Sequence, residues 1–346
     1  MADAALTPAQ SAVRLDVADP GMVLVAQQHA RQVARLAGLD ESAADNAALA
    51  AAELAGNAQR HGTGGQLILQ PAADAAAVDV VAIDRGPGMA DWERSFVDGY
   101  STTDRSLGAG LGAVVRVATT VTGWAEPGAG TVVGARIGPP GHAAVVGAIG
   151  TPYRGERVNG DAWSWSIDEA GIFAVLADGL GHGPAAAAAG AQAVTGPAGL
   201  AGLELPDALM HIHSRLRGTR GAAVTVVRLR PAADGAGHEL LVAGVGNVAA
   251  VVVSPDGTVR RTLIGHGTAG MAVRTPTQTS TPVAAGGVVV LHTDGLLSSW
   301  DLEGRGRSVA SPPGVIAAVL LRDHERGTDD TGVVVIKPAA AEGIGR

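Results

Sequence analysis

Three residues of one alanine-rich segment could do chemistry together. Glu53, Asn57 and His61 follow one another at intervals of four in "ELAGNAQRH", so a helix would place them along one face. Side chains of these types can bind a hard metal ion through oxygen or move a proton. A solvated polar face has the same pattern, so the spacing alone leaves both interpretations open.

Two glycine-rich segments follow this helix in the chain. In "DRGPGM", Asp84 comes directly after an apolar run, and Gly86 and Gly88 stand where backbone could approach a ligand closely. In "SLGAGLGAVVRVA", an apolar helix opens with three glycines, Gly108, Gly110 and Gly112. Free amides and the dipole at a helix start bind phosphate without a lysine.

The basic residues limit how a nucleotide could be held. The chain has 25 lysines and arginines, and only Lys337 is a lysine. A Walker A loop and a eukaryotic-type protein kinase both need a lysine on the phosphates, so residues 1–336 can contain neither. Backbone amides, a metal ion or arginine must take that role.

A second set of acids lies at strand ends or turns in the C-terminal half of the chain: Asp161, Asp178, Asp294 and Asp329. One Asp-Gly pair is an ordinary turn, but four acids beside separate β runs indicate a shared sheet edge. Carboxylates gathered there repel one another unless cations neutralise them. Two hard divalent ions bridged by such a cluster activate water and stabilise phosphoryl oxygens.

The elements around these residues divide into two domains. The segment "GPPGH" separates two β-rich runs, so we place the boundary near residue 140, between domains 1–139 and 140–346. In the first domain we expect helices over 22–37 and 42–61, the second capped by Ser42 and ended by Gly62. The second domain is mostly strand, with two expected helices, 184–195 and 205–217. The fold class is therefore α/β (α+β).

Composition excludes several classes of protein. The chain has no cysteine, so it has no disulfide, thiol nucleophile or cysteine-ligated zinc. The formal charge of −8 argues against a general nucleic-acid binder or a binder of anionic membranes. Neither a membrane span nor a secretory signal is expected, which predicts a cytoplasmic protein.

The order of the first motifs resembles the Bergerat-fold ATPases of the GHKL group, and most closely the RsbT-type serine kinases of the bacterial stressosome. The resemblance covers roughly residues 10–137 and implies an α/β sandwich that binds ATP and Mg²⁺. It implies that Asn57 coordinates Mg²⁺, that Asp84 hydrogen-bonds the adenine amino group and that Glu53 is the general base. Gly108, Gly110 and Gly112 would face the phosphates, with residues 98–107 as a lid.

The second set of acids resembles the SpoIIE-type branch of the protein phosphatase 2C superfamily, especially the short RsbX-like phosphatases, over about residues 143–338. This resemblance implies an α-β-β-α sandwich in which Asp161 and Asp178 bridge two Mn²⁺ or Mg²⁺ ions. The Gly179 carbonyl would be a further ligand, and Asp294 and Asp329 would complete one shell. The chain departs from the branch at three positions: Ala162, Trp163 and Gly332. His182 is interpreted as a turn residue or as a residue that contacts the ligands from outside, and not as a metal ligand itself.

Together the two resemblances imply a kinase fused to a phosphatase, both acting on STAS-domain regulators of an anti-sigma-factor network. An alternative is a first domain that binds ATP and a partner without transferring phosphate, which leaves the phosphatase as the only enzyme. A sensor histidine kinase is disfavoured because the sequence shows no helical dimerisation segment with a phosphoacceptor histidine.

Overall fold

The computed structural model describes residues 7–89, Trp92, Ser95, and residues 110–235, 237–302 and 309–338. Packing divides the chain into an N-terminal unit, Ser11–Gly141, and a C-terminal unit, His142–Arg346 together with the segment that ends at Gln10. The sequence placed that segment in the first domain, and the structure differs here. Gln10 explains the difference, because its buried side-chain amide donates to the carbonyl of Ala187.

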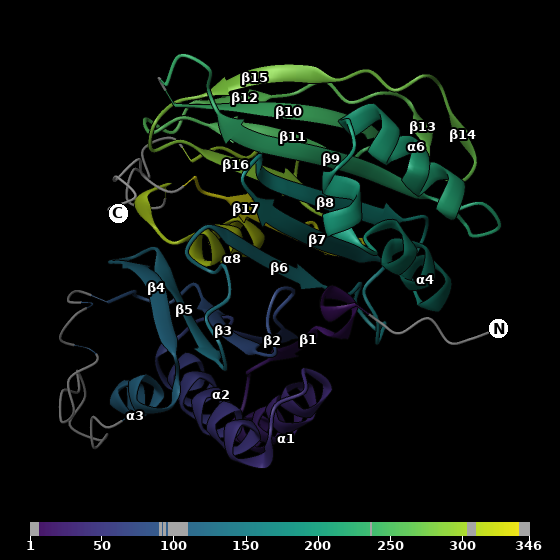
Figure 1. Cartoon of the computed structure of the whole chain (residues 1–346). Coiled ribbons are helices and arrows are strands. Elements are labelled where there is room, and N and C mark those ends of the chain that lie inside the picture. Colours follow the sequence, from purple (N-terminus) through teal and green to yellow (C-terminus); the bar gives the residue numbers. More distant parts are fainter. Residues whose placement is uncertain are drawn as a thin grey trace. The chain divides into compact units, whose positions relative to one another are not determined.

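The N-terminal unit is built on one antiparallel sheet with the order β1-β2-β3-β5-β4 (Figure 1). Its strands are β1 (Val13–Asp16), β2 (Gln66–Pro71), β3 (Val78–Asp84), β4 (Thr120–Glu126) and β5 (Gly130–Ile137). Three helices pack against it: α1 (Gly21–Leu36), α2 (Glu41–His61) and α3 (Gly110–Val117). Alanines such as Ala30 and Ala47 fill much of the core, so α1 and α2 can approach each other closely.

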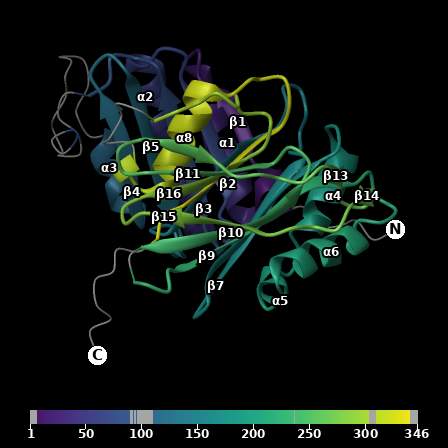
Figure 2. The ribbon, with the colours of Figure 1, turned by 90° about the horizontal axis from the view of Figure 1, so that it is seen from above.

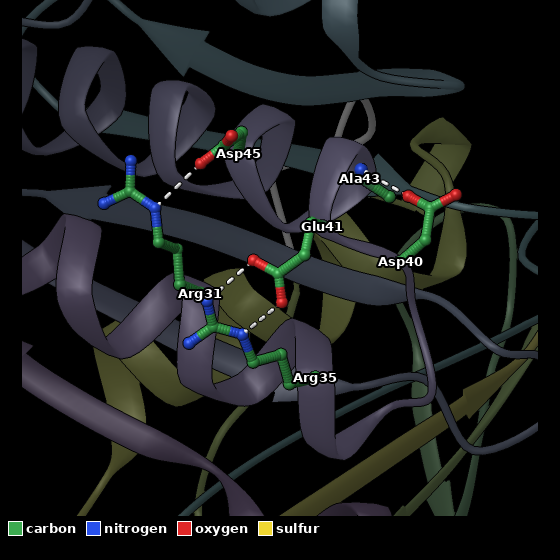
Figure 3. Close-up of polar contacts among 6 residues, drawn as sticks. All are labelled: Arg31, Arg35, Asp40, Glu41, Ala43 and Asp45. Atoms are coloured by element: carbon green, nitrogen blue, oxygen red, sulfur yellow. Dashed lines mark hydrogen bonds and ion pairs between the residues drawn. The ribbon is translucent and has the colours of Figure 1, made fainter.

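The start of α2 differs from the sequence prediction. Asp40, and not Ser42, is the N-cap: its Oδ1 accepts a hydrogen bond of 2.8 Å from the backbone N–H of Ala43 (Figure 3). Gly62 ends the helix as predicted. Two exposed ion pairs join α1 to α2 in the same view, Arg31–Asp45 and Arg35–Glu41.

The C-terminal unit contains two five-stranded antiparallel sheets that pack face to face (Figures 1 and 2). The first sheet has the order β15-β10-β9-β8-β7, with β7 (Asp161–Asp168), β8 (Gly171–Gly179), β9 (Ala222–Pro231), β10 (His238–Val245) and β15 (Thr279–Val283). The second has the order β12-β11-β16-β17-β6, with β6 (Val146–Thr151), β11 (Ala249–Val253), β12 (Val259–Arg261), β16 (Val288–His292) and β17 (Thr331–Ile336). A short two-stranded pair, β13 (Gly267–Thr268) and β14 (Ala272–Val273), lies beside β9.

Helices cover the outer faces of this sandwich. Three of them, α4 (Pro184–Ala193), α5 (Pro197–Ala201) and α6 (Leu205–Arg215), pack on the first sheet around a buried cluster that includes Phe173 and Leu209 (Figure 2). A fourth helix, α8 (Pro313–His324), packs on β6 and β17 of the second sheet. The α-β-β-α arrangement and the α/β class are thus confirmed.

Candidate nucleotide site and candidate metal centre

The predicted catalytic face of α2 lies next to the start of α3. Glu53 and Asn57 are both partly exposed on α2. A Cβ atom placed on Gly110 would lie 3.0 Å from Glu53 Oε2 and 3.6 Å from Asn57 Oδ1. The backbone at the start of α3 therefore approaches both side chains closely, and glycine keeps that approach open. Gly112 is buried in the first turn of α3.

Arg60 contributes to this face, although the sequence reasoning did not single it out. Its Nη2 donates a 3.0 Å hydrogen bond to Asn57 Oδ1, the oxygen expected to bind Mg²⁺. The i,i+3 spacing on α2 is the sequence signal that would have found this pair. His61 lies one residue further and is exposed. Desolvation and the charge of Arg60 lower the pKa of His61, while the charge of Asp84 acts to raise it.

Asp84 occupies the end of β3, as the sequence predicts. Its Oδ1 accepts a 2.7 Å hydrogen bond from the backbone N–H of Gly86, so the carboxylate is held against its own turn. Gly88 lies against the Glu126 carbonyl at the end of β4. Gly108 and the expected lid, residues 98–107, lie outside the described residues.

The acids of the C-terminal unit come from both sheets. Asp161 opens β7 and is paired directly with Asp178 on β8. Asp294 follows β16 in the other sheet, and Asp329 and Asp330 immediately precede β17. Gly179, next to Asp178, is the last residue of β8. The structure thus brings the predicted acids into electrostatic range of one another and adds Asp330 to them.

Burial and mutual repulsion raise the pKa values of three of these carboxyl groups, those of Asp161, Asp178 and Asp330. Burial raises the pKa of Asp178 to about 7, and the charges of Asp294, Asp329 and Asp330 add to the shift. The pKa of Asp161 is raised well above its ordinary value, first by burial and then by Asp178. Burial also raises the pKa of Asp330. The fold therefore concentrates carboxyl groups whose burial and mutual repulsion disfavour their charged forms.

Hydrogen bonds orient the acids, and most of their donors were missed from the sequence. Thr293 Oγ1 donates to Asp161 Oδ2 at 2.7 Å, and the backbone N–H of Tyr153 donates to Asp330 Oδ1 at 2.8 Å. Asn247 Nδ2 donates to Asp294 Oδ2 at 2.7 Å. Asn247 lies in the turn between β10 and β11.

Gly332 and His182 also find their places beside these acids. A Cβ atom on Gly332 would lie 3.2 Å from Asp161 Cβ, so glycine at this position gives Asp161 room. His182 is exposed in its turn, where its Nδ1 lies 2.6 Å from Glu156 Oε1 and its ring packs against Tyr153. It pairs with Glu156 and also faces the acid cluster, where its charge opposes the rise in the pKa of Asp330.

The donor set suits hard divalent cations. The five carboxyl groups offer oxygen alone, which Mg²⁺ and Mn²⁺ prefer. Asp330 Oδ2 is buried and has no hydrogen-bond partner among the described residues, an arrangement that a nearby cation or water would relieve. Across the part of the chain that the structure describes, however, no three Asp, Glu or His side chains already close around one point. The residues fit such ions chemically, and bound ions would have to draw the acids together.

Comparisons with known proteins agree with this division into two units. The family model of the histidine kinase-like ATPase domain matches residues 6–137. The model of SpoIIE, stage II sporulation protein E, matches residues 168–337. No curated protein sequence matches the chain.

Solved structures resemble more than half of the chain. One is described as "The bacterial stressosome: a modular system that has been adapted to control secondary messenger signaling". It has 24% sequence identity and a TM-score of 0.50, and the match covers 56% of this chain and 98% of that structure's chain. RsbX with magnesium has 18% identity, a TM-score of 0.45, and coverages of 54% and 92%. The RsbU and RsbW domains of a Mycobacterium tuberculosis protein have 20% identity, a TM-score of 0.45, and coverages of 57% and 62%.

Among the described residues, no helix is both long and apolar enough to cross a membrane. The matches to the two family models and the two observed folds lead to one assignment. The N-terminal unit is a histidine kinase-like ATPase domain, and the C-terminal unit contains a SpoIIE domain with the PP2C-type phosphatase fold.

Proposed function

We propose that the C-terminal unit is a metal-dependent phosphatase that removes phosphate from serine or threonine residues of a protein. The observation that supports this most is the concentration of acids from both sheets, whose repulsion adds to the effect of burial in raising the pKa of Asp178 to about 7. Such repulsion makes the metal-free site unfavourable, so binding of divalent cations would relieve it. The PP2C-type fold supports the same reaction.

The residues have separate tasks in this proposal. Asp161 and Asp178 would bridge two Mn²⁺ or Mg²⁺ ions, with three further ligands, the Gly179 carbonyl, Asp294 and Asp329. Ions held there would supply an activated water and would neutralise charge on the phosphoryl oxygens. Thr293 donates to one carboxylate oxygen of Asp161, and Asn247 donates to one carboxylate oxygen of Asp294. In each acid the other oxygen is left for a cation.

We propose that the N-terminal unit binds ATP with Mg²⁺ and transfers phosphate to serine or threonine. The grouping of Glu53, Asn57 and Gly110 supports this function. Asn57 would bind Mg²⁺, Asp84 the adenine amino group, and Glu53 would accept the proton of the substrate hydroxyl. The nucleotide would lie along five glycines, Gly86, Gly88, Gly108, Gly110 and Gly112. Arg60 must leave Asn57 Oδ1 when Mg²⁺ binds there, and is then free to pair with phosphate.

A second candidate function for this unit is ATP-dependent binding of a partner without transfer of phosphate. The exposed Arg60–Asn57 hydrogen bond favours it, because the expected metal ligand is already engaged. Under this alternative the phosphatase is the only enzyme of the chain.

We propose that the substrates are STAS-domain proteins of a sigma-factor regulatory network in the cytoplasm. The support is the resemblance of the motifs to RsbT-type kinases and RsbX-like phosphatases, together with the fold shared with a stressosome structure. The proposed domain boundary lies near residue 140.

Radioactive phosphate transfer tests these functions together. The full chain is incubated with [γ-³²P]ATP, Mg²⁺ and purified STAS-domain proteins, with and without Mn²⁺. We expect label to accumulate with Asp178→Asn, to stay low in the wild type with Mn²⁺, and to be absent with Glu53→Ala. If Asp178→Asn binds ATP but labels none of the partners, the kinase proposal is wrong and the binding function replaces it.

A further inference from the structure

A chain of buried polar groups runs behind the candidate metal centre. Trp300 is 1% exposed and His292 is 3% exposed, and Trp300 Nε1 donates a 3.1 Å hydrogen bond to His292 Nε2. The other ring nitrogen, His292 Nδ1, lies 2.8 Å from the backbone carbonyl of Thr293. None of these groups can exchange its partner for bulk water, so each bond constrains the next.

The two hydrogen bonds define the state of the imidazole. Since the indole N–H of Trp300 can only donate, His292 Nε2 must accept. Because a carbonyl can only accept, His292 Nδ1 must carry the proton and donate it to Thr293. His292 is thus a neutral ring with both nitrogens satisfied, and it holds the backbone of the residue that follows it.

Arg261 holds Trp300, the residue at the outer end of this series of hydrogen bonds. Its Nη2 donates a 3.0 Å hydrogen bond to the backbone carbonyl of Trp300, and its guanidinium carbon lies 5.7 Å from the indole centroid. A cation at this distance over an indole ring stabilises the ring's position. Trp300 is therefore held through both its backbone and its ring.

Thr293 connects the chain to the acids and joins the two sheets. It follows β16, and its Oγ1 donates to Asp161 Oδ2 at the start of β7 in the opposite sheet. The backbone N–H of Gly332, on β17, donates to the same Oγ1 at 2.9 Å. The hydroxyl has two acceptors within reach, Asp161 Oδ2 at 2.7 Å and the Gly332 carbonyl at 3.5 Å, so the short bond directs its single proton at Asp161. The position of the hydroxyl depends on how His292 holds the backbone.

We propose that Trp300 and His292 are positioning residues that act on Asp161 through Thr293. They hold the Thr293 hydroxyl so that Asp161 keeps Oδ2 in a hydrogen bond and turns Oδ1 towards the cations. This inference rests on the proposed phosphatase function, because it assigns the purpose of the arrangement to metal binding. Partners that orient a metal ligand from outside typically change metal affinity by about 10- to 100-fold when they are removed.

Trp300→Phe tests this series of hydrogen bonds, and Trp165→Phe is the matched control. Phenylalanine keeps an aromatic ring but removes the N–H on which His292 depends. Trp165 carries a buried Nε1 that has no hydrogen-bond partner within the described residues, so its replacement removes an unused N–H. We expect Trp300→Phe to weaken Mn²⁺ binding, measured by calorimetry on the metal-free full chain, by about 10-fold, and Trp165→Phe to leave it unchanged.

A double-mutant cycle separates positioning from general stability. Thr293→Val removes the hydroxyl and keeps the shape, and Thr293→Ser keeps the hydroxyl. If Trp300 acts through Thr293, adding Trp300→Phe to Thr293→Val should weaken Mn²⁺ binding no further, while adding it to Thr293→Ser should still do so. Additive losses of Mn²⁺ affinity in the first pair would overturn the proposal.

Crystal structures and ¹⁵N NMR of the His292 ring test the positioning role without measuring enzyme activity. In the wild type we expect a protonated Nδ1 and an unprotonated Nε2, and in Trp300→Phe a shifted Nε2 resonance and a lengthened Thr293–Asp161 hydrogen bond. If the wild type neither binds Mn²⁺ nor hydrolyses phosphoserine, the proposed function fails, whatever the variants do. If both hold for the wild type but Trp300→Phe leaves Asp161 and Mn²⁺ affinity unchanged, only the positioning role is wrong.

Discussion

The two candidate sites handle charge in opposite ways. In the C-terminal unit, buried acids from two sheets face one another, and the pKa of Asp178 rises to about 7. On α2 of the N-terminal unit, the polar groups lie at the surface and Arg60 already pairs with Asn57. A cation should therefore relieve the repulsion between the acids of the C-terminal unit. In the N-terminal unit a cation must instead compete with Arg60 for Asn57. Metal alone should bind the C-terminal unit, and the N-terminal unit should require nucleotide and metal together.

The largest expected effect comes from Asp178→Asn. This change removes a proposed bridging carboxylate, so hydrolysis of p-nitrophenyl phosphate and of phosphoserine protein should fall by roughly 10²-fold or more, as expected when the ions that activate water are lost. Chelation of the wild type should have the same effect, and added Mn²⁺ should reverse it.

Nucleotide binding by Asp178→Asn provides the control for that result. ATP affinity, measured by calorimetry, should equal that of the wild type because the N-terminal unit is untouched. Full phosphatase activity of the wild type in chelator would contradict the metal centre.

Asn57→Ala should have the next largest effect. Loss of the proposed Mg²⁺ ligand should weaken Mg²⁺-dependent ATP binding by at least about 10-fold, since loss of an outer partner alone can cost that much. Asp84→Asn should weaken ATP binding with or without Mg²⁺, because it alters adenine recognition. Calorimetry with ATP, with and without Mg²⁺, distinguishes the two losses.

Gln59→Ala is the matched control for Asn57→Ala. It shortens another polar side chain of α2, two residues away and off the proposed site, and should leave ATP affinity unchanged. Unchanged ATP affinity in both Asn57→Ala and Asp84→Asn would contradict the proposed nucleotide site.

Much of both sites could be predicted because their residues lie at recognisable points of local structure. Asp84 and Asp178 each end an apolar run followed by glycines, and Glu53 and Asn57 share a helical period. The four acids at strand ends could be grouped because several strands of one sandwich end at the same edge. Gly332 could be read as a departure, and the structure shows that it makes room beside Asp161.

The missed features depend on contacts between residues distant in sequence. Asn247 and Thr293 reach acids through the packing of two sheets, which no local pattern encodes. Helix α8 was missed because it is buried nearly all round and so lacks an amphipathic period. Asp40 caps α2 in place of Ser42 because the helix begins at Glu41. Ends of helices are the least certain part of a sequence prediction.

The pH dependence of stability should expose the difference in charge between the units. Since the pKa of Asp178 rises from 3.8 to about 7 on folding, the metal-free folded unit binds more protons than the unfolded chain between about pH 4 and 7. The stability of the metal-free C-terminal unit should therefore fall as pH rises through this window, and Asp161 acts in the same direction. Hydrogen exchange of β7 and β8, in chelator at pH 5 and pH 8 and corrected for intrinsic exchange rates, measures this loss.

Two controls sharpen that measurement. Asp178→Asn should stabilise the metal-free unit at pH 8 although it destroys metal binding, and Mn²⁺ at pH 8 should restore protection in the wild type only. If protection of β7 and β8 rises between pH 5 and pH 8 in chelator, the acids are not the uncompensated cluster that the fold indicates.

The smallest expected effect concerns the N-terminal unit, where stability should depend on helix caps and packing rather than on cations. Asp40→Ala removes the acceptor that binds the Ala43 N–H, so the unit should lose about 1 kcal/mol of stability. Asp40→Asn keeps an acceptor and should retain most of that stability. Glu41→Gln breaks the exposed pair with Arg35 (Figure 3) and should change stability little, because solvent screens such a pair. Hydrogen exchange of α2 in the full chain, in chelator and in Mn²⁺, measures all three. A loss in Glu41→Gln as large as that in Asp40→Ala, or protection of α2 by Mn²⁺ without nucleotide, would show that charge matters as much here as in the C-terminal unit.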